Sequence, residues 1–158
     1  MNSVVLLGTR HSVQRDHGRT EFTRYLENLV KRYDVKTVAE EIDKESVAAA
    51  LASRLRIDYK IIEPTPEERK KLGILSENEI ECSVFFEYDD IDSQEAQSES
   101  ASRKQSASDS REKEWLERVK SINNFPVLVI CGAFHFQSFG SLLRNYGFQV
   151  TEECGLWE

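Results

Sequence analysis

Short apolar runs alternate along this chain with stretches of helical period, and this alternation constrains the fold more than any other feature. The apolar runs predict strands over about 3–8, 35–42, 59–63, 127–131 and 148–152. Between most of them, apolar residues recur every three or four positions, which predicts helices. The pattern is typical of proteins in which crossover helices join parallel strands. We therefore expect an α/β fold: a single three-layer domain with a mostly parallel sheet of about five strands.

Capping residues set the expected helix boundaries. Asp43 is expected to cap the helix that follows the second strand. The segment 76–79 has the capping-box pattern and predicts a helix to about Tyr88, although the alternating apolar residues of 82–88 also fit a strand. Gly147 is expected to end the last helix, because glycine readily adopts the left-handed conformation found at helix C-termini.

A long polar segment interrupts the pattern in the middle of the chain. Residues 89–110 include seven serines and show no apolar periodicity. Such a segment buries too little apolar surface to offset the entropy lost on ordering, so we expect a mobile loop or a loosely held helix. Helical periodicity resumes at Arg111. The expected organisation is one domain over 1–158 with a mobile polar insertion over 89–110, and a tolerated surface insertion is favoured over an active-site lid.

Charge and composition exclude several classes of partner. The formal net charge is −7 and no dense stripe of Lys or Arg occurs, so we expect no nucleic-acid partner. No apolar run approaches the roughly 20 residues that span a bilayer, so we expect no membrane association. The sequence enters its first strand without a signal-peptide pattern, and its three cysteines share no C-x-x-C spacing. These features predict a cytoplasmic protein.

Two strands are each followed by a glycine and, three residues later, a histidine. The segments are Gly8-Thr9-Arg10-His11 and Gly132-Ala133-Phe134-His135. Glycine permits a tight turn and leaves the backbone open to a ligand, while histidine titrates near neutrality and binds metals. Either segment alone is more often an ordinary strand-end turn. Because the chain has only three histidines, the pair favours a functional site formed by His11 and His135.

Carboxylates follow the other strands. Glu40 and Glu41 end the second strand, and Glu63 ends the third. Ligands of parallel sheets bind at the carboxyl ends of the strands, so these side chains are expected near the two histidines. Glu40 and Glu41 are consecutive and should face opposite sides of the sheet, and Glu41 is slightly favoured for the site. Glu63 precedes a proline and is as readily a residue at the rim.

Arg111 and Glu112 open the helix that follows the polar segment. An arginine at this position can hold an anionic or carbonyl group through forked hydrogen bonds. A glutamate in the first turn of a helix also has a purely structural explanation, because it interacts favourably with the helix dipole.

The order of these landmarks resembles that of the TraB/TIKI, erythromycin-esterase and ChaN-like superfamily. The resemblance rests on the two G-x-x-H segments, the acidic strand end and the segment Arg111-Glu112-x-x-Trp115. It implies an α/β fold and a site that contains paired histidines and acidic residues. Members resemble metal-dependent proteases, open a lactone, or bind haem. The site residues that the resemblance implies are His11, Glu41, Arg111, Glu112 and His135, with Glu40 as a further candidate.

These observations predict a hydrolase that acts on an amide, ester or lactone bond of a small molecule or peptide. In a metal-dependent version, His11, His135 and Glu40 or Glu41 hold manganese or zinc, which activates water. In a metal-free version, a histidine–glutamate pair is the general base and Arg111 stabilises the oxyanion.

Two alternatives remain open. The same pocket could bind haem or another small molecule without catalysis. The segment Arg10-His11-Ser12 also resembles the Arg-His-Gly motif of histidine phosphatases, which implies phosphoryl transfer through His11. This second alternative is less favoured, because Ser12 and Phe136 stand where that family usually has glycine.

Overall fold

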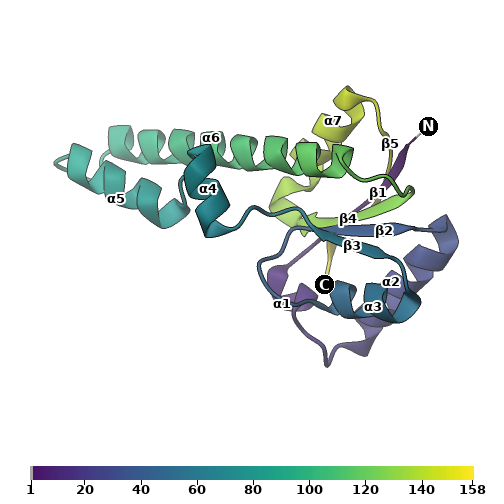
Figure 1. Cartoon of the computed structure of the whole chain (residues 1–158). Helices are drawn as coiled ribbons and strands as arrows, with labels where there is room; N and C mark the ends of the chain where they lie inside the picture. The colour runs from purple at the N-terminus through teal and green to yellow at the C-terminus, as the bar shows by residue number, and fades with distance from the viewer. Residues whose placement is uncertain (1) are drawn as a thin grey trace. The chain divides into compact units, whose positions relative to one another are not determined.

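The computed structural model of the protein describes residues 2–158 (Figure 1). The chain forms two compact units. The first contains the residues up to Glu63 together with Trp115–Glu158, and the second is Pro64–Glu114. The strands are β1 (Ser3–Thr9), β2 (Thr37–Glu40), β3 (Asp58–Ile61), β4 (Val127–Gly132) and β5 (Gln149–Trp157). The helices are α1 (His11–Gln14), α2 (Thr20–Tyr33), α3 (Val47–Leu55), α4 (Pro66–Leu72), α5 (Glu77–Glu87), α6 (Gln94–Lys120), the 3-10 helix η1 (Ala133–His135) and α7 (Phe136–Tyr146).

The first unit contains a five-stranded sheet in the order β3-β2-β4-β1-β5, in which each neighbouring pair is parallel. Helices cover both of its faces. The predicted three-layer α/β fold with crossover helices is therefore confirmed. Strand β4 enters the sheet between β1 and β2, although it follows both along the chain. In register, Leu6 of β1 lies beside Val129 of β4, and Ala39 of β2 lies on the other side of Val129.

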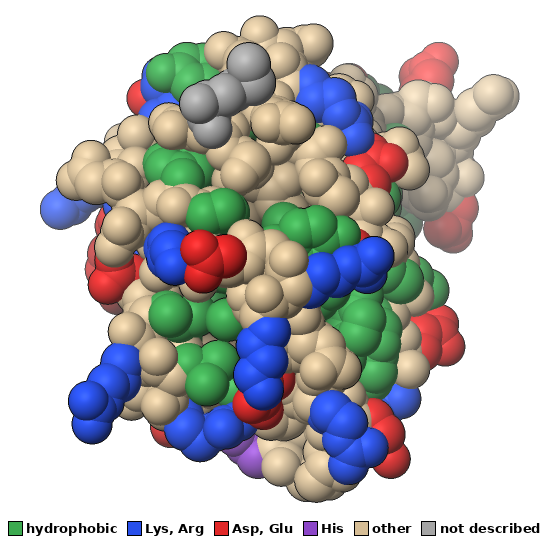
Figure 2. Space-filling view, turned by 90° about the vertical axis from the view of Figure 1, so that its right-hand side faces the viewer, with side chains coloured by type: hydrophobic (Ala, Val, Ile, Leu, Met, Phe, Trp, Pro, Cys, Tyr) green, Lys and Arg blue, Asp and Glu red, His purple; other side chains and the backbone are tan. Residues whose placement is uncertain are grey.

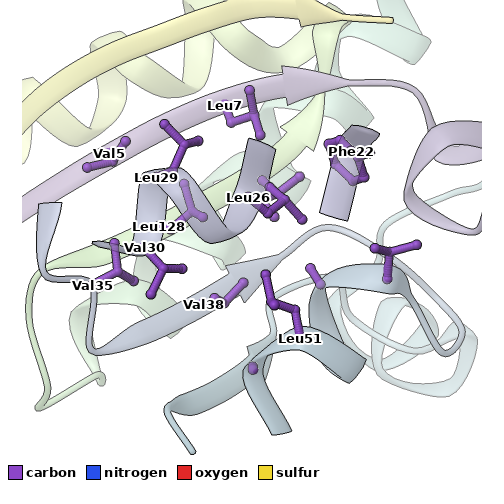
Figure 3. Close-up of a cluster of buried hydrophobic side chains, with 14 of the residues drawn as sticks. Val5, Leu7, Phe22, Leu26, Leu29, Val30, Val35, Val38, Leu51 and Leu128 are labelled. Carbon is purple, nitrogen blue, oxygen red and sulfur yellow. The ribbon is translucent and has the colours of Figure 1, made fainter. Parts of the chain in front are cut away.

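One face of the sheet packs against α2 and α3. Figure 3 shows the aliphatic and aromatic side chains of α2 between this helix and the strands. Phe22 and Leu26 of α2 are fully buried and meet Leu7 of β1 and Leu128 of β4 in one cluster. Because successive residues of a strand point to opposite faces, the odd-numbered residues of β1 belong to this layer.

The opposite face packs against α7 and the last residues of α6. Val4 and Leu6 of β1 meet Phe139 of α7 and Trp115 of α6 in a second cluster. Both aromatic side chains are fully buried. The two clusters give the sheet an apolar layer on each face, as expected for a buried parallel sheet.

Strand β5 is an edge strand whose pairing with β1 is irregular. The register shifts around Leu7 and Thr9, beside Gly155. A Cβ atom on Gly8 would lie 2.2 Å from the carbonyl oxygen of Gly155. Gly8 therefore permits the close approach of β5, and this packing accounts for the glycine without a ligand.

Charged side chains lie along the outer edge at β5. Arg144 pairs with Glu152 at 2.6 Å, and Arg32 pairs with Glu153 at 3.4 Å. Figure 2 faces the side on the right of Figure 1, where the chain enters β1, and shows hydrophobic side chains in separate patches between Lys, Arg, Asp and Glu side chains. Charges on an edge strand oppose pairing with a strand of another molecule.

The cap of α3 differs from the sequence-based prediction. Ser46, rather than Asp43, is the N-cap, and its hydroxyl accepts a hydrogen bond from the amide of Ala49 at 3.0 Å. Asp43 instead forms an ion pair with Arg15. The second strand ends at Glu40, two residues before its expected end, so the loop from 41 to 45 separates the strand from the helix.

The helix expected from Arg111 begins at Gln94 instead, so most of the polar segment is helical. Ser93 supplies a start signal, because its hydroxyl accepts a hydrogen bond from the amide of Ala96. Glu99 and Arg103 then form an i,i+4 ion pair, which stabilises a helix in this order. The composition of the segment hid these local interactions. The division into one domain with a mobile insertion over 89–110 stays a prediction.

The second unit begins with two capped helices. Thr65 and Glu68 form a capping box at α4. Ser76 and Glu79 form the predicted capping box at α5, which confirms a helix rather than a strand over Glu77–Glu87. Within residues 2–158, none of the helices is both long and apolar enough to cross a bilayer.

Candidate functional site

The two G-x-x-H segments lie at the point where the sheet changes its direction of winding. Strands β1 and β4 are neighbours. The chain leaves β1 towards α2 on one face and leaves β4 towards α7 on the opposite face. Ligands of doubly wound sheets bind outside the carboxyl ends of the strands at such a point. His11 and His135 follow these two strands, so the topology places both at this position.

His11 begins the short helix α1, and its ring is held by a residue of the same turn. The Nδ1 atom lies 2.8 Å from the side-chain oxygen of Gln14. The amide nitrogen of Gln14 donates to Oε2 of Glu40 at 2.9 Å and to the backbone carbonyl of Glu41 at 3.1 Å. These two acceptors fix the amide, so its oxygen faces His11 and accepts a hydrogen bond from Nδ1–H. The neutral imidazole therefore carries its proton on Nδ1 and a lone pair on Nε2.

Glu41 faces that lone pair. Its Oε1 atom accepts a hydrogen bond from the backbone amide of Gly132 at 2.7 Å, and its Oε2 atom lies 3.6 Å from Nε2 of His11. The Glu41 side chain is 3% exposed, whereas that of His11 is 43% exposed. A buried carboxylate is thus held in place beside an imidazole that is partly exposed to solvent.

This geometry raises the pKa of His11 above its ordinary value of 6.5. The main cause is the interaction of the protonated ring with Glu41, and burial of the ring opposes it. Glu41 therefore stabilises the imidazolium that forms when His11 takes up a proton.

Glu40 points to the other side of β2 and is completely buried. Its Oε1 atom accepts hydrogen bonds from the hydroxyl groups of Ser46 and Tyr59, and its Oε2 atom accepts from Gln14. Burial raises the pKa of Glu40, although these three donors favour the charged form and oppose the shift. Burial and the nearby Glu40 also raise the pKa of Tyr59. Glu40 therefore holds Gln14 in position from a closed, hydrogen-bonded environment.

We expect Glu40 to make the stability of the protein depend on pH. Its pKa is higher in the folded than in the unfolded chain, so the folded state keeps the proton over a range in which the unfolded state has lost it. Glu40 therefore contributes to the free energy of unfolding below about pH 4.5, and this contribution is lost as the pH rises through the raised pKa. The free energy of unfolding changes by at most about 1.4 kcal/mol per pH unit. Urea unfolding at several pH values, compared between the wild type and Glu40→Gln, measures this difference. A wild type whose stability rises relative to the variant over this range would contradict it.

His135 borders the same space from the side of β4. A Cβ atom on Gly132 would lie 3.3 Å from Oε1 of Glu41 and 3.9 Å from Cδ2 of His135, so both side chains flank this glycine. The imidazole packs edge to face on Trp115, with ring centroids 4.7 Å apart. The indole of Trp115 donates a hydrogen bond to Glu63 at 2.9 Å. Glu63 is thus a buried partner of Trp115 rather than a residue at the rim.

The structure brings together four of the predicted site residues: His11, Glu40, Glu41 and His135. They are linked through Gln14 and Gly132. Arg111 and Glu112 belong to the second unit, on α6, and their part in the site stays a prediction. Gln14 is a residue of the site that no motif in the sequence indicates. The available signal was its spacing of three residues from His11, which places the two side chains on one face of a helical turn.

Two side chains that can ligate a metal ion, His11 and Glu41, face each other at the site. Within residues 2–158, no group of three or more His, Cys, Asp or Glu side chains is arranged to hold one. His11 and Glu41 supply two donors, whereas zinc sites in enzymes commonly use three protein ligands. Glu40 is engaged by Ser46, Tyr59 and Gln14. A metal-dependent version of the site stays a prediction.

Comparison with known proteins gives no relative for this site. No protein-family model, no curated protein and no solved structure matches the chain. The resemblance to the TraB/TIKI, erythromycin-esterase and ChaN-like superfamily consequently stays a prediction from the short landmarks in the sequence.

Proposed function

We propose that the protein is a hydrolase that cleaves an ester, lactone or amide with His11 as the general base. The observation that carries the proposal is the pair of acceptors at the site. Nε2 of His11 and Oε2 of Glu41 face each other at 3.6 Å, which is too long for a direct hydrogen bond. A water molecule that donates one proton to each acceptor fits this spacing and keeps its oxygen lone pairs available for attack.

In the proposed reaction His11 first accepts and then donates a proton, and Glu41 stabilises its protonated form. His11 removes a proton from the water as the oxygen forms a bond to the carbonyl carbon of the substrate. The resulting imidazolium is stabilised by Glu41, which already raises the pKa of His11. When the bond to the leaving group breaks, His11 returns the proton to the departing oxygen or nitrogen. The side chain of His11 ends the cycle neutral.

Other groups are proposed to stabilise the negative charge of the reaction or to line the site. Helix α7 begins directly after His135, which is its N-cap residue. The dipole of this helix favours negative charge near its amino-terminal end, such as the charge that develops on the carbonyl oxygen of the substrate. The roles of Arg111 and Glu112 in the reaction stay predictions from the sequence. His135 forms a wall of the site beside Gly132.

The proposal is tested with untagged protein and a panel of 4-nitrophenyl esters, lactones and amides. Hydrolysis above the uncatalysed rate by the wild type, and its loss in His11→Ala, is the expected result. The variant His17→Ala is the matched control, because it removes the histidine that lies outside the site. Equal rates in the wild type and His11→Ala would contradict the proposal.

Replacing Gln14 by leucine is expected to lower kcat/KM by about 10-fold to 100-fold, as for other residues that orient a functional imidazole. The substitution preserves the approximate size of the side chain but removes the acceptor for Nδ1–H of His11. NMR of the ring nitrogens should show a larger population of the tautomer protonated on Nε2. Unchanged activity together with an unchanged tautomer would contradict this role.

A metal-dependent version of the same hydrolase is tested by elemental analysis. Wild-type protein and the double variant His11→Ala/His135→Ala are purified without an affinity tag. Stoichiometric manganese or zinc in the wild type alone would support this version. Wild-type protein that gains no metal on reconstitution would leave the metal-free reaction described above.

A further inference from the structure

The second unit has an apolar groove between α5 and α6 that the proposed reaction does not use. The groove has a volume of about 790 Å³. Its apolar lining consists of Cys82, Val84, Phe85 and Phe86 from α5, Ala96 from α6, and Ile91 from the loop that joins them, and the ion pair of Lys104 with Glu81 also lines it. Its volume lies within the range typical of binding sites in proteins.

The aromatic side chains of this groove are exposed. Phe86 is 84% exposed and Phe85 is 57% exposed. Their rings contact each other edge to face, with centroids 5.6 Å apart. Exposed aromatic side chains beside an apolar groove are typical of surfaces that bind another protein.

The segment that forms most of the groove carries a large excess of negative charge. From Glu77 to Glu99 the sequence has nine acidic residues and no Lys or Arg. The next two basic residues are already paired, because Arg103 binds Glu87 and Glu99, and Lys104 binds Glu81. The residues of the first unit carry equal numbers of acidic and basic side chains, so the net charge of −7 belongs to the second unit.

From this combination we infer that the groove binds a basic, amphipathic helical segment of a partner protein. The apolar face of such a helix would cover Phe85, Phe86 and Ile91, and its Lys and Arg residues would meet the acidic rim. Amphipathic helices bind apolar grooves in this way. A second copy of this chain is disfavoured, because it would bring two acidic units together.

The test is a titration of the protein, residues 1–158, into a fluorescein-labelled peptide of about 18 residues with Leu and Lys at helical spacing. This is a length at which isolated helices begin to form. Fluorescence anisotropy is expected to show saturable binding. The double variant Phe85→Ala/Phe86→Ala should weaken binding at least about tenfold, because aromatic side chains dominate such interfaces. Higher salt should also weaken binding.

Two controls separate this site from non-specific attraction. Phe134→Ala removes a similarly exposed aromatic side chain from the first unit and should leave binding unchanged. A peptide with Glu in place of Lys should bind at least about tenfold more weakly, because its charges repel the acidic rim.

Four outcomes would overturn the inference. They are no saturable binding up to about 1 mM protein, equal binding by Phe85→Ala/Phe86→Ala, equal binding of the Glu peptide, and self-association on sedimentation that this double variant abolishes. The last result would identify a second copy as the occupant. Circular dichroism confirms that the double variant is folded.

Discussion

Replacing Glu41 by glutamine is expected to lower kcat/KM for hydrolysis by about 100-fold to 10,000-fold, the range of contributions from general-base catalysis. The carboxamide oxygen can still accept the hydrogen bond from the amide of Gly132, so the local fold should persist. The variant loses the negative charge that stabilises the imidazolium of His11. Steady-state kinetics with the best ester of the panel measures the effect.

The neighbouring glutamate supplies the matched control. Glu40→Gln changes the same atoms one residue earlier but on the other side of β2, where the side chain contacts Ser46, Tyr59 and Gln14. We expect kcat/KM to change by no more than about tenfold, because Glu40 is linked to His11 by hydrogen bonds through Gln14 and otherwise acts on it only at a distance, through its charge. A larger loss in Glu40→Gln than in Glu41→Gln would contradict the assignment of Glu41 as the partner of His11.

Replacing Gly8 by alanine is expected to lower the free energy of unfolding by about 3 kcal/mol or more. The added Cβ atom would lie 2.2 Å from the carbonyl oxygen of Gly155 and 2.9 Å from its carbonyl carbon. Because both atoms belong to the backbone, relief requires β5 to move away from β1. Urea unfolding followed by circular dichroism measures the loss.

Gly18→Ala is the control for this substitution. A Cβ atom on Gly18 meets only Oδ1 of Asp16 at 3.4 Å, which is ordinary contact. We expect its stability to lie within about 0.5 kcal/mol of the wild type, as for most surface substitutions. If Gly8→Ala lowered the free energy of unfolding no more than Gly18→Ala does, this would contradict the close packing of β1 against β5.

Local patterns in the sequence predicted the sheet and its helices. The strand that ends at Gly132 is a continuous apolar run, and its central residues are buried on both faces. The capping box at Ser76 and Glu79 resolved the choice between helix and strand at α5. In both cases, residues that are neighbours in the sequence determine the outcome, so the pattern and the structure agree.

These local patterns do not predict contacts between segments that are distant in the sequence. The hydrogen bond between Gln14 and Glu40 joins the end of α1 to the end of β2, which only the sheet order brings together. Gly8 is explained by Gly155, which lies almost at the other end of the chain. The serine-rich segment differs for another reason. Its polar composition predicts a mobile loop or a loosely held helix, whereas the cap at Ser93 and the ion pair of Glu99 with Arg103 stabilise a regular helix.

The pairing of His11 with Glu41 is tested most directly by NMR titration of the His11 ring in the wild type and in Glu41→Gln. In the wild type, the titration midpoint should lie above 6.5, and the neutral ring should carry its proton on Nδ1. The midpoint should fall in Glu41→Gln, because the variant lacks the charge that holds the proton on the ring. A wild-type midpoint at or below 6.5 that does not change in Glu41→Gln would contradict the pairing and the hydrolytic reaction derived from it.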